Sequence, residues 1–180
     1  MLRLAYAILA GLVGAGIVHI AVLLMLPQFS EGDAWSRLAM QAGPFRVVQA
    51  DKVTEGSAIV APQDPLFMAA LCRFDLAEGM AHLRAEGRVP FWSVSVYDRG
   101  GQNVYSLNDR AAEDGHLDLV VLQQAQMIEV RKFLPDDMEH SIFVETPVDE
   151  GIVAVRAFVP DTTWRPAVAG WLASLSCDAK

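Results

Sequence analysis

The feature that most constrains this chain is an uninterrupted apolar run near its start. The segment from Leu4 to Leu26 contains no Asp, Glu, Lys or Arg, and a stretch of about 20 such residues is long enough to cross the hydrocarbon core of a bilayer. The sequence therefore predicts a transmembrane signal-anchor over residues 1–27. The rest of the 180 residues is enough for one folded domain and hardly for two.

A cleaved secretory signal is the alternative interpretation of the same run. Such a signal has a shorter apolar centre of about 7 to 15 residues, followed by small residues at the cleavage site. Cleavage within Gly14–Gly16 would leave the segment Ile17–Leu26 as a new apolar terminus. The length of the run fits an uncleaved anchor better, and cleavage stays open as the alternative.

Basic residues and cysteines predict on which side of the membrane the domain lies. Arg3 precedes the run, and the next basic residue after it is Arg37. The positive-inside tendency then keeps the amino end in the cytoplasm and the domain outside it. Cys72 and Cys177 are the only cysteines, and a pair in an oxidising compartment is a candidate disulfide. The alternative is a buried Cys72 thiol and a frayed, terminal Cys177 thiol.

Charge and helix composition limit the classes of partner. The chain carries 14 Lys and Arg against 22 Asp and Glu, a net charge of -8 at pH 7, which repels phosphate backbones and anionic lipid headgroups. We therefore expect no nucleic-acid partner. Within the run, Ala7, Gly11 and Ala15 recur every four residues, and small residues at this spacing let a second helix approach closely. The expected partners are the membrane and either another envelope protein or a second copy.

The rest of the chain is predicted to form short strands and few helices. Residues 28–43 are expected to form a linker helix, because Ser30 provides a capping hydroxyl ahead of Trp35 and Leu38. The domain at 44–180 is expected to contain seven or eight strands, drawn from the candidate segments 45–49, 58–60, 70–76, 80–86, 91–98, 102–107, 116–122, 142–145 and 152–159. Helices are expected over 123–134 and 163–175. This pattern predicts a mainly antiparallel, sandwich-like α+β domain with two or three peripheral helices.

Alternation within the longer strands also predicts their pairing. Phe74, Leu83 and Trp92 lie on the apolar sides of three successive strands. Apolar sides must match across a pair, because a slip of one residue would expose the buried side. With Glu78–Gly79 as a two-residue turn, the sequence predicts an antiparallel meander over residues 68–107 that buries these three side chains together. The strands at 142–145 and 152–159 are expected to form a last pair.

The polar sides of the same strands carry the candidate site. The predicted register aligns Asp75, His82 and Ser93 in one row, in the order of an acid, a base and a nucleophile. No oxyanion site or exposed nucleophile is indicated, so we assign no catalytic residue. A solvated polar face is one interpretation and a face for an acidic or sugar-like ligand is the other. The candidate ligand-binding face comprises Arg73, Asp75, His82, Arg84, Ser93, Ser95, Tyr97 and Arg110.

No metal or cofactor is expected from the motifs present. His82, His116 and His140 are dispersed, and neither a Cys-x-x-Cys nor a His-x-His spacing occurs. Gly100–Gly101 connects two predicted strands, whereas a phosphate-binding loop connects a strand to a helix. The sequence therefore indicates neither a metal centre nor a nucleotide site.

The stretch from Phe91 to Arg110 has a recognisable pattern: an aromatic residue, Trp-Ser-x-x-x-Tyr-Asp, a glycine turn, and Asn-x-x-x-x-Asn-x-Arg. In this pattern the chain resembles the bacterial envelope family called domain of unknown function 1254 and its frequent companion, domain of unknown function 1214. Residues 64–67, 72–75 and 155–160 are similar to those of short membrane-anchored members from alphaproteobacteria. The resemblance implies a β-rich envelope domain without an established activity. With the predicted orientation, it implies an inner-membrane protein whose domain faces the periplasm.

Two functions follow as expectations. The first is a membrane-anchored periplasmic binding or scaffolding module that works beside another envelope protein. The second is an envelope hydrolase that acts on a glycan or an ester through the polar strand face. A deep pocket over Asp75, His82 and Ser93 would favour the enzyme, whereas a flat, exposed apolar patch would favour a protein partner.

Overall fold

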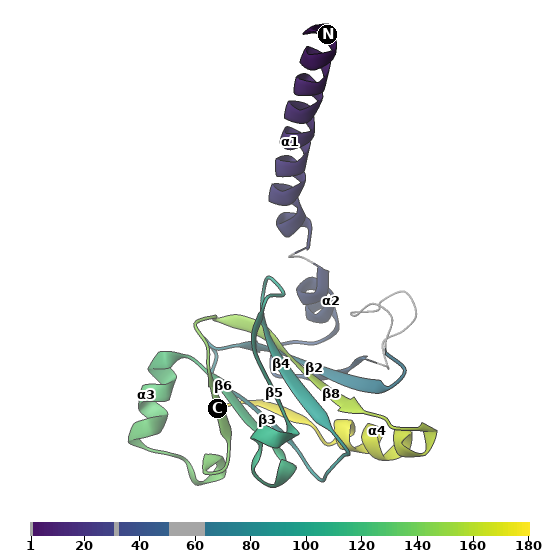
Figure 1. The fold of residues 1–180 in the computed structure, drawn as a ribbon. Helices are drawn as coiled ribbons and strands as arrows, with labels where there is room; N and C mark the ends of the chain where they lie inside the picture. The colour runs from purple at the N-terminus through teal and green to yellow at the C-terminus, as the bar shows by residue number, and fades with distance from the viewer. Residues whose placement is uncertain (1, 31–32, 51–63) are drawn as a thin grey trace.

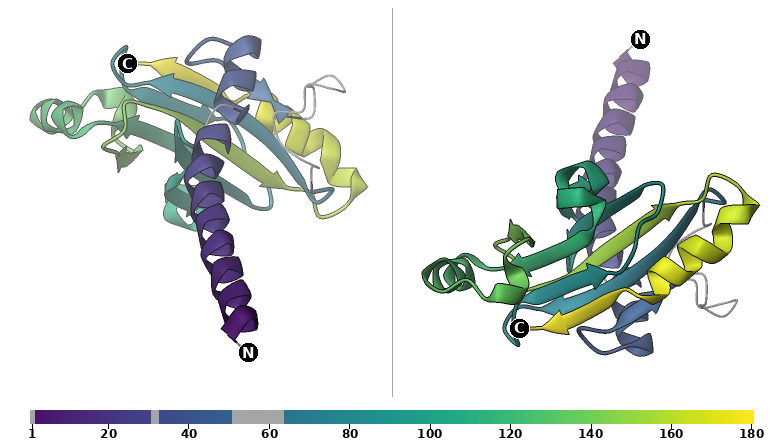
Figure 2. Two further views of the ribbon diagram at one scale, coloured as in Figure 1. Left: turned by 90° about the horizontal axis from the view of Figure 1, so that it is seen from above. Right: turned by 90° about the horizontal axis from the view of Figure 1, so that it is seen from below.

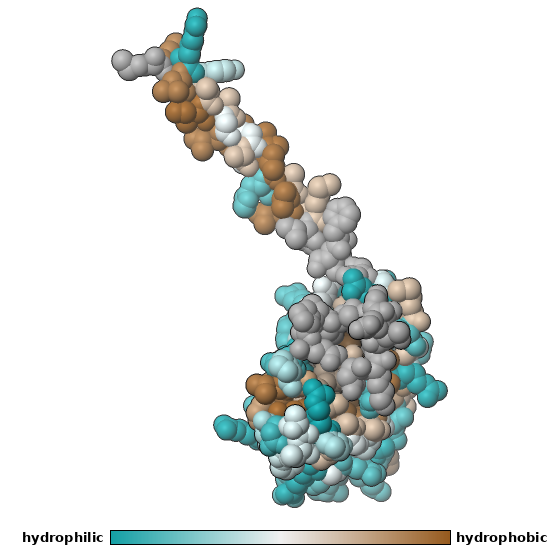
Figure 3. All heavy atoms as spheres, turned by 90° about the vertical axis from the view of Figure 1, so that its right-hand side faces the viewer, coloured by the Kyte–Doolittle hydropathy of each residue, from teal (hydrophilic) through white to brown (hydrophobic). Residues whose placement is uncertain are grey.

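A long apolar helix precedes a β-rich domain in this protein (Figure 1). The computed structural model describes residues 2–30, 33–50 and 64–180. Helix α1 (Leu2–Ser30) contains a segment, Leu2–Met25, that is long and apolar enough to cross a membrane, and no part of it is buried in the protein. Its apolar surface contrasts with the many polar residues on the face of the domain that Figure 3 shows. The predicted apolar helix is confirmed; a signal sequence meets the same criteria of length and composition.

Nine strands in the described residues form two sheets, as expected for a mainly antiparallel α+β domain. The five-stranded sheet has the order β1 (Val47–Gln49), β2 (Phe67–Asp75), β8 (Glu150–Phe158), β4 (Trp92–Asp98) and β5 (Asn103–Asn108). The four-stranded sheet has the order β7 (Ile142–Glu145), β6 (Leu117–Leu122), β3 (Ala81–Ala85) and β9 (Ser176–Ala179). Every pair is antiparallel except β6 with β7. Three further helices are α2 (Asp33–Gln41), α3 (Gln124–Lys132) and α4 (Arg165–Ala173).

The apolar sides of the two sheets share one core. Phe74, Leu83 and Trp92 are all buried in it, which confirms that these three side chains are buried together. A disulfide joins Cys72 of β2 to Cys177 of β9, with 6.6 Å between their Cα atoms. The predicted disulfide is therefore present, and it connects the five-stranded sheet to the four-stranded sheet.

The predicted meander over residues 68–107 is wrong in its first two pairings, and its last pair, β4 with β5, occurs as predicted. Strand β2 pairs with β1 and β8, whereas β3 pairs with β6 and β9 in the other sheet. The chain crosses between the sheets after Leu76, and the backbone of Met80 then pairs with that of Lys180. At Gly79 an added Cβ would lie 2.8 Å from the carbonyl oxygen of Lys180. Gly79 therefore permits this close passage of two chain segments and does not form a hairpin turn.

The predicted last pair, 142–145 with 152–159, is also wrong. Strand β7 pairs in parallel with β6, and β8 lies at the centre of the five-stranded sheet. Helix α3 connects β6 to the segment before β7, and a helical connection of this kind lets two successive strands run parallel. The candidate strand at 58–60 lies outside the described residues.

The two predicted domain helices differ in how their apolar residues are used. In α4 and the residues after it, Val168, Trp171, Leu172 and Leu175 are buried, so the predicted docking of this helix is confirmed. The predicted apolar face of the 123–134 helix is wrong, because Ile128 and Phe133 are 52% and 79% exposed. Helix α3 instead packs through Val130 on the outer face of the four-stranded sheet.

Helix α2 packs on the outer face of the five-stranded sheet. Leu38 is fully buried there, in a cluster with Leu71, Ile152 and Ala154. Trp35 lies beside the sheet, with its ring 4.9 Å from the guanidinium carbon of Arg73. Seen from below, α4 and β9, the edge strand of the four-stranded sheet, lie toward the viewer and α1 lies behind the sheets (Figure 2). The chain thus passes from α1 onto the outer face of the five-stranded sheet.

Candidate functional site

The structure divides the eight predicted ligand-binding residues between two sheets. Five of them lie on the polar side of the five-stranded sheet: Arg73, Asp75, Ser93, Ser95 and Tyr97. His82 and Arg84 lie on β3 of the four-stranded sheet, and Arg110 lies in the short 3-10 turn after β5. The polar sides of two sheets that pack through their apolar sides point away from each other. The eight residues therefore do not form one face.

The predicted row of Asp75, His82 and Ser93 is wrong. None of the three is opposite another: Asp75 is opposite Glu150, His82 is opposite Val120 and Asp178, and Ser93 is opposite Arg156 and Asn108. The row was derived from β2–β3 and β3–β4 pairing, neither of which occurs. The hydrolase interpretation loses the arrangement on which it was based.

A different set of polar side chains is brought together on β8, β4 and β5. We call it the polar strip; it consists of Ser93, Ser95, Ser106, Asn108 and Arg156. The pairing places Arg156, Ser93 and Asn108 directly opposite one another in one row, with Ser95 and Ser106 in the next row. The hydroxyl of Ser106 donates to Ser95 Oγ at 3.0 Å. Arg156 and Ser106 are exposed, so α2 leaves this part of the sheet open.

Sequence reasoning found Ser93 and Ser95 but missed the other three members of the strip. The resemblance included Asn108 and Arg156 without giving either a role. A usable signal existed in β8, where Arg156 interrupts the otherwise apolar run Ile152–Val159. Its partner strands could not be identified, because β8 pairs with strands that lie far away in the sequence.

The other half of the same face is occupied by α2. The Trp35 ring lies 4.9 Å from the guanidinium carbon of Arg73 and 5.8 Å from that of Arg99, and cations at such distances are attracted to the ring. Arg99 Nη1 also donates to Glu150 Oε2 at 2.8 Å. These two cations are engaged in holding α2 on the sheet. In contrast, Arg156 has no carboxylate partner within the described part of the chain.

The outer face of the four-stranded sheet holds a buried polar cluster. His82 is fully buried, and its Nε2 donates to Asp118 Oδ1 at 2.8 Å. The hydroxyl of Ser141 donates to the same carboxylate oxygen, and it lies 3.5 Å from His82 Nε2. The carboxylate is therefore central, whereas a nucleophilic triad requires the imidazole between acid and hydroxyl. The cluster holds the segment before β7 on the sheet and does not activate Ser141.

Segments of the chain cover this second face. A 3-10 turn, η4 (Asp136–Met138), buries Met138 against Val120 and Val130. Lys180 Nζ donates to Asp137 Oδ2 at 2.8 Å, and this bond lowers the pKa of Asp137 below its ordinary value of 3.8. The turn η4 is thus tied to the end of β9, on the sheet that it covers.

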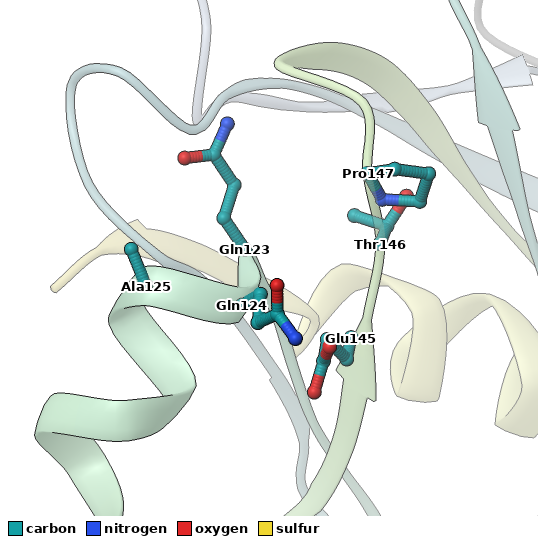
Figure 4. Close-up of a pocket in the computed structure, with 6 residues that line it drawn as sticks. All are labelled: Gln123, Gln124, Ala125, Glu145, Thr146 and Pro147. Atoms are coloured by element: carbon teal, nitrogen blue, oxygen red, sulfur yellow. The ribbon is translucent and has the colours of Figure 1, made fainter.

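A cavity of about 350 Å³ lies between the start of α3 and the end of β7. Its lining residues are Gln123, Gln124, Ala125, Glu145, Thr146 and Pro147 (Figure 4). The amide of Gln123 donates to Asp149, so this side chain is already engaged. None of the eight predicted ligand-binding residues lines this cavity, and it therefore adds no support to a site at Asp75, His82 and Ser93.

Comparison with known proteins shows the fold alone. No family model and no curated protein sequence matches this chain. The VPA0106 protein from Vibrio parahaemolyticus has a similar solved structure, with a TM-score of 0.58 and 8% identity, over 84% of this chain and 35% of that one. An uncharacterised protein from Burkholderia cenocepacia matches with a TM-score of 0.47 and 14% identity, over 74% of this chain and 37% of that one. The chain thus spans about a third of the length of these two solved proteins.

Proposed function

We propose that this protein is a membrane-anchored binding module of the bacterial envelope, with its domain in the periplasm and the polar strip as its binding face. The observation that carries the proposal is the path of the chain. Helix α1 ends at Ser30, α2 begins at Asp33, and Leu38 of α2 is buried on the same sheet face that carries the strip. A bilayer that holds α1 is therefore linked most directly to this face.

Two further observations support the periplasmic side. Arg3 is the only basic residue before Arg37, which favours a cytoplasmic amino end. The Cys72–Cys177 disulfide connects the two sheets, and structural disulfides persist in oxidising compartments. Carbonate washing of membranes tests the anchor: the protein should stay in the membrane fraction, and release in soluble form would contradict an uncleaved α1.

Chemistry of the strip favours binding over hydrolysis. It offers hydroxyls, an amide and a guanidinium, all of which can form hydrogen bonds to a ligand. Within the described residues it contains no imidazole or carboxylate that could act as a general base for its serines. The strip can therefore hold a ligand, whereas its own five residues include no group that could take a proton from a nucleophile.

Photocrosslinking in native membranes tests the binding face. A photoreactive amino acid placed at Ser95 or Ser106 should give adducts that mass spectrometry can identify. The matched control is Ala173, which is exposed on α4, on the side of the sheets that faces away from α1 (Figure 2). Adducts of equal yield from Ala173, or none from the strip, would refute the strip as the binding face.

A further inference from the structure

We propose that the polar strip binds an anionic group that carries hydroxyls, namely a phosphate or carboxylate on a small polyol. A phospholipid headgroup of the glycerol phosphate type and free glycerol phosphate share this chemistry. The inference rests on the proposed function, because it names the ligand class for the same binding face. It is carried by the position of Arg156, by the donors beside it and by the aromatic pair at the end of the strip.

Arg156 is an exposed cation on the central strand of the five-stranded sheet. The residues directly opposite it are Ala69 on β2 and Ser93 on β4, neither of which can neutralise its charge. No carboxylate pairs with it among the described residues. A guanidinium presents planar donors that match the oxygens of phosphate or carboxylate. Arg156 is therefore a cation on this face that is available to an anion.

Neutral donors continue the row from Arg156. Ser93 is directly opposite Arg156, and Asn108 is directly opposite Ser93. Because neighbouring strands lie about 4.8 Å apart, the row spans roughly 10 Å, which suits a phosphate with a three-carbon polyol. Asn108 Oδ1 accepts from the backbone N–H of Arg110 at 3.1 Å. Its amide N–H groups are thus the part of Asn108 that can donate to a ligand.

The second row supplies hydroxyls for the polyol. Asn103 Nδ2 donates to Ser106 Oγ at 2.9 Å, and Ser106 Oγ donates to Ser95 Oγ at 3.0 Å. The single proton of the Ser106 hydroxyl has two acceptors, Ser95 Oγ and, at 3.2 Å, Asn103 Oδ1. The hydroxyl proton of Ser95 is used in neither bond, so Ser95 can donate it to an acceptor on the ligand. Hydroxyls can both donate and accept, so they suit a partner that does the same.

An aromatic pair borders the strip beyond Arg156. Phe158 follows Arg156 by two residues and therefore lies on the same side of β8. Its ring packs against Phe67 of β2, with 5.5 Å between the ring centroids. Both rings are partly exposed, so they offer apolar surface to the carbon atoms of a ligand whose charged end lies at Arg156.

The acidic composition of the chain does not prevent anion binding at this place. Glu150, on the same strand, is paired with Arg99 at 2.8 Å, and Asp75 accepts the backbone N–H of Ala77. Both lie at the opposite end of the sheet face from Arg156. At physiological ionic strength charges are screened over about 8 Å. Glu150 and Asp75 therefore contribute little to the potential at Arg156.

The first experiment uses the full chain in nanodiscs of phosphatidylcholine. Titration with sn-glycerol 3-phosphate, followed by NMR of the backbone amides, should give saturable shifts at Ser93, Ser106 and Asn108, whereas glycerol alone should give none. Arg156→Gln should raise the Kd about tenfold or more, because it removes a charged hydrogen-bond donor. The matched control is Arg131→Gln, which makes the same charge change on exposed α3 and should leave the Kd unchanged. Unchanged core amides show that each variant is folded.

Nanodiscs that contain phosphatidylglycerol distinguish the two sources of the ligand. If the headgroup is the ligand, the strip amides are already shifted in these discs, and added glycerol phosphate changes them little. If the ligand is soluble, the spectra of both discs agree until glycerol phosphate is added. The proposal is overturned if neither glycerol phosphate nor phosphatidylglycerol shifts the strip amides. It is also overturned if Arg156→Gln binds glycerol phosphate with the same Kd as the wild type. If a photoreactive residue at Ser95 still gives adducts in that case, the strip remains the binding face and only the ligand class is rejected. If both the amide shifts and the adducts are absent, the strip is rejected as a binding face as well.

Discussion

The two sheets are alike on their inner sides and different on their outer sides. Both place small and large aliphatic residues in one shared core. On the outer side of the four-stranded sheet, α3 and η4 bury Val120 and Leu122, and the polar His82 is fully buried beside them. On the outer side of the five-stranded sheet, α2 covers only the part around Leu71, and Arg156 remains exposed.

This difference indicates what the polar residues of each sheet contribute. An unpaired buried polar group costs stability, so the bond of His82 Nε2 to Asp118 serves cohesion, although the buried Nδ1 of His82 has no partner among the described residues. A cation on an open sheet face, such as Arg156, contributes little to stability and stays available to a ligand. The comparison therefore assigns cohesion to the polar cluster around His82, and it agrees with the binding role proposed for the polar strip.

The largest effect is expected where the two sheets are covalently joined. Replacing Cys72 and Cys177 together by Ala removes a link across 105 residues, and the chain-entropy model predicts a loss of about 4 to 5 kcal/mol in the free energy of unfolding. Urea unfolding of the full chain in detergent measures this. Reduced wild type is the control and should lose a similar amount. Thiol labelling of unreduced, denatured protein from intact cells should find no free thiol; two reactive thiols would contradict an oxidising compartment.

The next prediction tests the contrast between the sheets directly. His82→Ala should lower the free energy of unfolding by about 2 to 4 kcal/mol, because it leaves a cavity and deprives Asp118 of a partner. Ser93→Ala on the open strip should change it by less than about 0.5 kcal/mol. The same urea unfolding measures both variants. Equal losses would show that the strip, too, is part of the stable core, and the comparison would fail.

A third, smaller effect concerns the attachment of α2. Leu38→Ala should weaken the docking of α2 by about 2 kcal/mol, because Leu38 is fully buried in a small satellite cluster. Hydrogen exchange should show faster exchange in α2 and unchanged exchange in the four-stranded sheet. The control is Met40→Ala on the same helix, since Met40 is 81% exposed and its truncation should change nothing. Faster exchange throughout both sheets would mean that α2 is not a separable element.

Local patterns identified nearly every described strand but not its partners. Alternation is a property of one strand, so Phe74, Leu83 and Trp92 could be placed in the core from sequence alone. Pairing depends on which apolar sides meet, and the same alternation fits either sheet. The turn at Gly79 was misread for this reason, because a glycine permits a hairpin as well as the close passage by Lys180.

The candidate site shows the same limit. Ser93 and Ser95 were found because they lie on the polar side of their own strand, whereas Arg156 joins them through a pairing of distant segments. The partners of His82 were missed likewise, since Asp118 and Ser141 lie 36 and 59 residues away. A helix between two strands, here α3 between β6 and β7, was the available signal for the parallel pair.

The smallest predicted effect compares two carboxylates with lowered pKa values. The Lys180 ammonium lowers the pKa of Asp137 below 3.8, and hydrogen bonds from Thr163 lower that of Asp161. A carboxylate with a lowered pKa contributes stability above pH 3.8, and this contribution is lost as the pH falls through its folded value. Lys180→Met should return the pKa of Asp137 toward its ordinary value and leave that of Asp161 unchanged.

Carbon-detected NMR titration of the two carboxyl groups measures this difference, and 1 M salt should raise the pKa of Asp137 more than that of Asp161, because an exposed ion pair is screened. Asp137 lies in η4, which helps to cover the four-stranded sheet, whereas Asp161 is bonded within its own turn, at the Thr163 hydroxyl and N–H. If Asp137 keeps its lowered pKa in Lys180→Met, Lys180 does not hold η4 on the four-stranded sheet. Met138 and the His82 cluster alone would then keep η4 on the outer face of that sheet.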